Sequence, residues 1–103
     1  MQISMNEAMK MMETEGDYTI LDVRTIEEYN EGHIPGAICV PNETIQDAAP
    51  KELPDKGRVI LVYCRSGNRS KQAAAKLAKL GYTKLYEFGG IIDWPGEIVK
   101  NDQ

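Results

Sequence analysis

The feature of this sequence that most constrains its fold is an apolar run that leads directly into a polar, glycine-containing loop. The run, 58–63 (RVILVY), is nearly continuous in apolar residues, as strands buried on both faces of a parallel sheet are. The loop 64–69 (CRSGNR) follows, and small and apolar residues then recur at helical spacing over 70–80, before Gly81. A strand, a loop and a helix in this order predict one unit of an α/β fold.

Three further segments have the composition of strands. Short apolar and β-branched runs occur at 18–23, 37–40 and 85–88, whereas 42–57 contains two prolines and predicts only a short helix and loops. Because strands alternate with helical segments, we expect an open, mostly parallel sheet with helices on both faces. The whole chain, 1–103, suffices for one core of this kind, so we expect a single domain.

Two capping boxes and a C-terminal stretch predict the remaining helices. Ser4 with Glu7, and Thr25 with Glu28, have the spacing at which each side chain bonds the backbone N–H of the other. We therefore expect helices to begin directly after Ser4 and Thr25. The stretch 91–100 is expected to be helical but broken by its proline.

Cys64 stands where open α/β sheets bind their ligands, beyond the carboxyl end of a strand and before a helix N-terminus. Unpaired N–H groups at a helix N-terminus and neighbouring cations both stabilise a thiolate. Gly67 permits the tight turn through which successive N–H groups converge on one anion. We predict that Cys64 is a nucleophile in an anion-binding loop. The binding residues of this loop are Arg65, Ser66, Gly67, Asn68 and Arg69.

A nucleophilic sulfur in an anion cradle suits two reactions. It can attack phosphorus to give phosphocysteine, or attack the outer sulfur of a small anionic donor to give a persulfide. Phosphatases with a catalytic cysteine use a Cys-x5-Arg loop around a phosphoryl group, whereas only four residues separate Cys64 from Arg69. The shorter loop favours sulfur transfer over the alternative of a phosphatase or arsenate reductase. An inert buried thiol is the weaker interpretation, because such thiols are seldom followed by so polar a sequence.

Charge and composition narrow the possible partners and cofactors. Twelve basic against sixteen acidic residues give a net charge of −4, so nucleic acid is not an expected partner. A hydrophobic share of 42% and a charged share of 27% are typical of soluble chains, and no membrane association is expected. Two cysteines and one histidine are too few for a structural zinc site, and we expect no metal or other cofactor.

The second thiol and the N-terminal sequence bear on location. Cys39 lies in the apolar run 37–40, so burial should raise its pKa and leave it unreactive. A resolving role, through a disulfide with Cys64, is the alternative. The first twelve residues lack the features of a signal peptide, and free thiols suit a reducing compartment, so we expect a cytoplasmic location.

Four stretches of the chain together resemble the rhodanese family in its stand-alone, single-domain form. They are LDVR followed by EEY at 21–29, GHIPGA at 32–37, YCRSGNRS at 63–70, and the pair Gly89-Gly90, expected to form a turn, with Trp94. The resemblance implies a rhodanese-like fold and the activity of a thiosulfate sulfurtransferase.

The resemblance also implies roles for individual residues. Cys64 would carry the persulfide, the backbone amides from Arg65 to Arg69 would stabilise it, and Arg65 or Arg69 would bind a donor such as thiosulfate. Cyanide, a thiol or a sulfur-accepting protein would be the acceptor. Asp22, Arg24 and His33 would have mainly structural roles. The alternative is a non-catalytic rhodanese-like module that binds a partner protein, but such modules usually lack the cysteine that this chain has.

Overall fold

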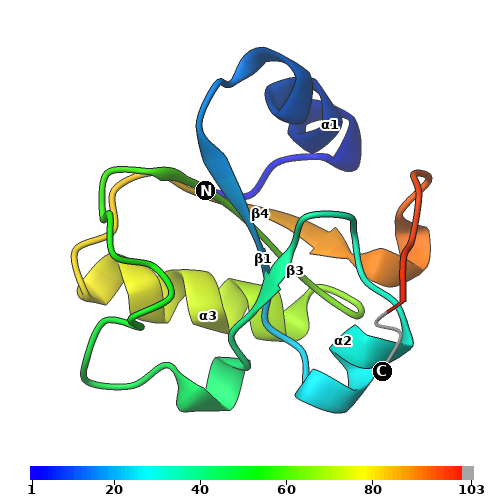
Figure 1. Cartoon of the computed structure of the whole chain (residues 1–103). Helices are drawn as coiled ribbons and strands as arrows, with labels where there is room; N and C mark the ends of the chain where they lie inside the picture. Colours follow the sequence, from blue (N-terminus) through cyan, green and yellow to red (C-terminus); the bar gives the residue numbers. More distant parts are fainter. Residues whose placement is uncertain (101–103) are drawn as a thin grey trace.

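Four parallel strands form an open sheet in a computed structural model that describes residues 1–100 (Figure 1). The strands are β1 (Tyr18–Asp22), β2 (Ile38–Cys39), β3 (Val59–Cys64) and β4 (Leu85–Gly90). Their order across the sheet is β2-β1-β3-β4, and every neighbouring pair is parallel. The α/β fold with a parallel sheet, expected from the sequence, is confirmed.

Three helices connect and cover the strands: α1 (Met5–Thr14), α2 (Ile26–Glu31) and α3 (Asn68–Lys79). Both predicted capping boxes are present, before α1 and before α2. The Ser4 hydroxyl accepts a hydrogen bond from the Glu7 N–H at 3.0 Å, and the Glu7 carboxylate accepts one from the Ser4 N–H at 2.8 Å. Each box satisfies N–H groups that a helix start leaves unpaired, and so fixes where the helix begins.

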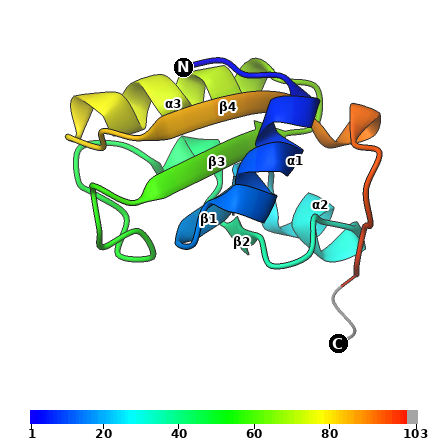
Figure 2. The same cartoon turned by 90° about the horizontal axis from the view of Figure 1, so that it is seen from above.

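Helices lie on both faces of the sheet, α3 on one and α1 on the other (Figure 2). The side chains of β3 alternate between two buried apolar clusters, as the period of a strand requires. The cluster on the α3 side takes Ile60, Val62 and Cys64. The cluster on the α1 side takes Val59, Leu61 and Tyr63, and Tyr29 of α2 packs against it. The nucleophile predicted from the sequence therefore faces α3.

A buried polar network lies at the carboxyl end of β1. Asp22 is fully buried, and both of its carboxylate oxygens accept hydrogen bonds from the Arg24 guanidinium, at 2.7 to 3.1 Å. The Tyr63 hydroxyl also donates to Asp22, at 2.7 Å. His33 stacks on the Tyr29 ring and bonds the Tyr29 carbonyl through Nδ1. These contacts join β1, α2 and β3 inside the fold.

The C-terminal part of the chain differs from the prediction. Only a single 3-10 turn, Ile91–Asp93, forms where a broken helix was expected over 91–100. Trp94 is extended, as residues before proline prefer to be. Val99 instead pairs with His33 through two backbone hydrogen bonds of 2.8 and 2.9 Å. Residues 94–100 therefore run past α2 without forming a helix (Figure 1).

Other predicted boundaries moved by a few residues. The helix expected over 70–80 begins two residues earlier, at Asn68, so Asn68 and Arg69 belong to its first turn. The segment 42–57 contains one 3-10 turn, Asn42–Thr44, in place of the short helix. Within residues 1–100 no helix is both long enough and apolar enough to span a bilayer.

Candidate active site

Cys64 is the last residue of β3, and its sulfur faces the N-terminal end of α3. Its Sγ accepts a hydrogen bond from the Gly67 N–H at 3.0 Å and lies 3.6 Å from the Ser70 hydroxyl. Gly67 is the N-cap of α3 and adopts the left-handed conformation, with φ of 109°, that favours glycine. The turn predicted at Gly67 is therefore present, and it aims a backbone donor at the sulfur.

The surroundings of Cys64 favour its thiolate. Burial raises the pKa of the Cys64 thiol. Hydrogen bonds from the Ser70 side chain and from the backbone of Ser70, Gly67 and Ser66 lower it by more, so that this pKa lies below its ordinary value. A thiolate, not a thiol, is the nucleophilic form. The loop therefore prepares Cys64 for attack on an electrophile.

Gly89 and Gly90 form the end of β4 beside the loop, where a turn was predicted. The register of β3 against β4 slips between Val62 and Cys64, which leaves one extra residue on β4 and marks a β-bulge. Gly89 has the positive φ of 102° that such a bulge can require. A Cβ at Gly90 would overlap the Arg65 carbonyl oxygen and lie 2.6 Å from the Ser66 Cα. The paired glycines thus let the loop backbone lie directly on β4.

We predict that Gly90→Ala displaces the loop and reduces both stability and activity. The added methyl group would meet backbone rather than a flexible side chain, so relief requires the loop to move, at a cost of about 1–3 kcal/mol. Thermal or urea unfolding measures the loss of stability, and alkylation of Cys64 reports on the loop. Gly16→Ala is the control, because a Cβ there meets nothing within 4 Å. Equal effects of the two substitutions would contradict this role of Gly90.

The two arginines of the loop have different surroundings. Arg69 donates two hydrogen bonds to the Glu28 carboxylate of α2, at 2.7 and 3.0 Å. These bonds hold the pKa of Glu28 at about 2. Arg65 is exposed and lines a cavity of about 270 Å³. Within residues 1–100 Arg65 therefore forms no ion pair, whereas Arg69 joins α3 to α2.

The cavity beside Arg65 lies between the loop, α2 and the C-terminal segment. Its other lining residues are Arg24, Glu28, Glu31, Gly32, Ile91, Ile92 and Ile98. Ser66 and Asn68 are exposed at the loop surface, while the Cys64 side chain is buried beneath them.

Cys39 lies on β2, away from the loop. It is half-buried rather than in the core, and its Sγ donates to the Arg24 carbonyl at 3.6 Å. Burial raises the pKa of Cys39 to about 12, as expected for an unreactive thiol. Cys39 and Tyr63 both pair with Asp22, so Cys39 and β3 are two strand spacings, about 10 Å, apart. A disulfide needs Cα atoms closer than about 7 Å, so a bond to Cys64 would require backbone movement.

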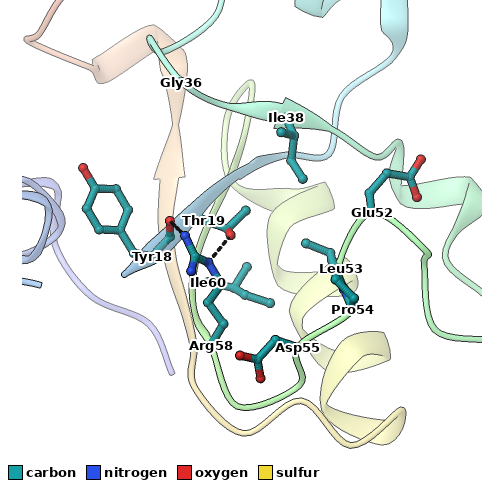
Figure 3. A pocket seen from close by; sticks show the side chains of 10 residues that line it. All are labelled: Tyr18, Thr19, Gly36, Ile38, Glu52, Leu53, Pro54, Asp55, Arg58 and Ile60. Atoms are coloured by element: carbon teal, nitrogen blue, oxygen red, sulfur yellow. Dashed lines mark hydrogen bonds between the residues drawn. The ribbon is translucent and has the colours of Figure 1, made fainter. Parts of the chain in front are cut away.

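A larger cavity, of about 470 Å³, lies at the opposite ends of the strands (Figure 3). Arg58 crosses it and donates to the Thr19 hydroxyl at 2.8 Å and to the Tyr18 carbonyl at 2.7 Å. Its lining residues within 1–100 include no cysteine or histidine. In the same range no three His, Cys, Asp or Glu side chains gather as metal ligands. We therefore place the candidate site at the Cys64 loop and not in the larger cavity.

Sequence reasoning missed three residues that this site depends on. The sequence predicts Glu28 in a capping box, Gly90 in a turn and Ser70 at the start of a helix, and all three lie in stretches that resemble the rhodanese family, but none of them is predicted as a site residue. Each acts through a contact across the fold: with Arg69, with the Arg65 carbonyl and with the Cys64 sulfur. Ser70 had a further local signal, because it directly follows the loop.

The sequence matches a known family. Residues 4–97 match the model of the rhodanese-like domain. The chain therefore belongs to the rhodanese-like domain family, and the resemblance seen in the four sequence stretches is confirmed.

Two of the relatives of known name are sulfurtransferases. The chain is 37% identical over 73 residues to the thiosulfate sulfurtransferase PspE of Escherichia coli, and the match covers 71% of this chain and 70% of that one. It is 40% identical over 88 residues to a sulfurtransferase of Allochromatium vinosum, covering 84% and 79% of the two chains. The putative sulfur carrier protein YrkF of Bacillus subtilis is 34% identical over 97 residues, 93% of this chain and about half (51%) of that protein.

A solved structure also superposes well. It is described as a rhodanese with anions from E. coli, and it matches with a TM-score of 0.74 at 34% sequence identity. The match covers 82% of this chain and 99% of that one. The arrangement of strands and helices is therefore that of a rhodanese-like domain.

Proposed function

We propose that this protein is a thiosulfate sulfurtransferase in which Cys64 carries the transferred sulfur as a persulfide. The observation that carries the proposal is the hydrogen bond from the Gly67 N–H to the Cys64 sulfur, in a loop that lowers the pKa of that thiol. The names of two relatives, thiosulfate sulfurtransferase and sulfurtransferase, support it.

The reaction has two half-steps. In the first, the Cys64 thiolate attacks the outer sulfur of thiosulfate, a new S–S bond forms, and the S–S bond of thiosulfate breaks with its electron pair leaving on sulfite. In the second, cyanide or a thiolate attacks the outer sulfur of the persulfide. The S–S bond to Cys64 then breaks and restores the thiolate. Backbone N–H groups of the loop stabilise the charged sulfur in both steps.

Mass spectrometry of the intact protein and of its peptides tests this function. Thiosulfate should add one sulfur atom to the peptide that contains Cys64, and cyanide should remove that atom as thiocyanate. A protein that remains unmodified by thiosulfate would favour the other class, a rhodanese-like module that recognises a partner protein without catalysis.

We expect Arg65 to contact the anionic donor and Arg69 to position the loop. Arg65→Ala should raise the KM for thiosulfate about tenfold, because a charge-assisted hydrogen bond contributes about 1.5 kcal/mol, while kcat changes little. Arg69→Ala should lower kcat, because it releases α3 from Glu28. Steady-state kinetics with varied thiosulfate separate the two effects. The reverse pattern would exchange the roles of the two arginines.

A further inference from the structure

A buried carboxylate lies directly behind the Cys64 loop. Glu87, on β4, is only 2% exposed, although charged side chains are almost never fully buried unless paired. No cation within residues 1–100 forms an ion pair with it. Its Oε1 accepts hydrogen bonds from the Ser70 hydroxyl at 2.8 Å and from the Gly89 N–H at 2.9 Å. Its Oε2 is buried and has no hydrogen-bond partner in the same part of the chain.

The Ser70 hydroxyl connects this carboxylate to the nucleophile. Ser70 Oγ lies 2.8 Å from Glu87 Oε1, 2.9 Å from the Gly67 carbonyl oxygen and 3.6 Å from Cys64 Sγ, so two oxygen acceptors are within reach of its hydroxyl hydrogen. A hydroxyl has one hydrogen to donate and two lone pairs that accept. Ser70 can therefore donate to an ionised Glu87 while it accepts from the Cys64 thiol. After rotation of its O–H bond it can donate to a Cys64 thiolate while it accepts from a protonated Glu87.

Once the sulfur is charged, burial favours the arrangement in which Glu87 is protonated and Ser70 donates to the thiolate. Two negative charges joined by one hydroxyl in a buried cluster repel each other, which disfavours the doubly ionised state. The Cys64 thiolate is stabilised by backbone N–H groups, whereas Oε2 of Glu87 has no hydrogen-bond donor among residues 1–100. An unpartnered buried charge costs free energy, and a proton on Glu87 removes that cost.

We propose that Cys64 and Glu87 share one proton through the Ser70 hydroxyl. Glu87 is then a positioning residue that holds the thiol proton while the sulfur is charged, an inference that deepens the proposed function. When the thiolate forms, the S–H bond of Cys64 breaks and its proton passes to Ser70 Oγ, while the Ser70 proton passes to Glu87 Oε1. No group is oxidised or reduced, and the total charge of the three groups stays at −1.

Two other charged groups lie near Glu87. Lys71 of α3 lines the same cavity of about 280 Å³ as Glu87, and the Met1 ammonium group donates to the Leu85 carbonyl at 3.0 Å. Neither of them hydrogen-bonds to Glu87 within residues 1–100. The Cys64 thiol, from β3, is the titratable group that a hydrogen-bonded route joins to Glu87.

The pH dependence of Cys64 alkylation by iodoacetamide tests the pair in a Cys39→Ser background. Coupled groups titrate with two macroscopic pKa values, so the alkylation rate of the parent protein should rise in two steps. Glu87→Gln should leave a single step that lies below the upper step of the parent, because a neutral amide replaces the charge. Alkylation between these steps should be faster than in the parent, by about twofold if the parent's two groups share the proton equally. Glu87→Asp should keep two steps, and Glu13→Gln, which changes an exposed carboxylate of α1, should leave the profile unchanged.

Infrared difference spectra of the Cys39→Ser protein give a readout that needs no substitution at Glu87. At a pH between the two steps, alkylation of Cys64 should weaken the carboxylic-acid C=O band as Glu87 loses its proton, and a Ser70→Ala protein should lack this change. A one-step profile that Glu87→Gln does not shift, or an acid band that alkylation leaves unaltered, overturns the proposal. Neither measurement uses a sulfur donor. A negative result for the shared proton can therefore be told apart from a failure of sulfur transfer.

Discussion

The Cys64→Ser protein should gain no sulfur from thiosulfate, and its thiocyanate formation should fall at least about a thousandfold, to the uncatalysed background. The reason is chemical: a serine hydroxyl in this loop cannot form a persulfide, although the N–H groups around it remain. The change replaces one small buried atom, so the fold should be retained. Thiocyanate assays and mass spectrometry measure the loss.

Cys39→Ser provides the matched control for this experiment. Cys39 is half-buried on β2, and its raised pKa of about 12 makes it a poor nucleophile. The control should therefore keep the parent rate and still take up one sulfur atom. Thiocyanate formation that continues at the parent rate in Cys64→Ser would show that the sulfur is carried elsewhere.

One residue inserted between Asn68 and Arg69 should lower sulfur transfer by roughly a hundredfold, the usual effect of losing one well-placed hydrogen-bond donor. The two residues lie in the first turn of α3. If the inserted residue extends the helix, Ser70 rotates by about 100° about the helix axis, away from the Cys64 sulfur. If it lengthens the loop instead, the Gly67 N–H moves away from that sulfur. Either change also breaks the contact of Arg69 with Glu28. Assays of thiocyanate formation against the parent protein measure the fall.

The same protein tests whether loop length separates sulfur transfer from phosphoryl transfer. The parent chain should hydrolyse aryl phosphates no faster than Cys64→Ser does. An insertion between Asp47 and Ala48, in an exposed segment far along the chain from the loop, should leave sulfur transfer intact. Phosphatase turnover that depends on Cys64 in the parent protein would instead favour the phosphatase alternative.

Local sequence was sufficient for the elements that carry the nucleophile. The apolar run at 58–63 predicted β3, and the small-residue periodicity after it predicted α3, because burial on both faces or on one stripe leaves a local pattern. The capping boxes placed the starts of α1 and α2 correctly, since their hydrogen bonds join residues three positions apart. Gly67 signalled the turn that aims an N–H at Cys64.

The contacts between segments distant in sequence became visible only in the tertiary structure. The contact of Arg69 with Glu28 joins residues 41 positions apart, and no local pattern predicts it. Gly90 looked like part of a turn until the β-bulge placed it under the loop. Glu87 stood out in no sequence pattern, and only the pairing of β3 with β4 and the packing of α3 set it behind Ser70. Such contacts depend on how elements pack across the sheet, and spacing along one chain segment does not encode that packing.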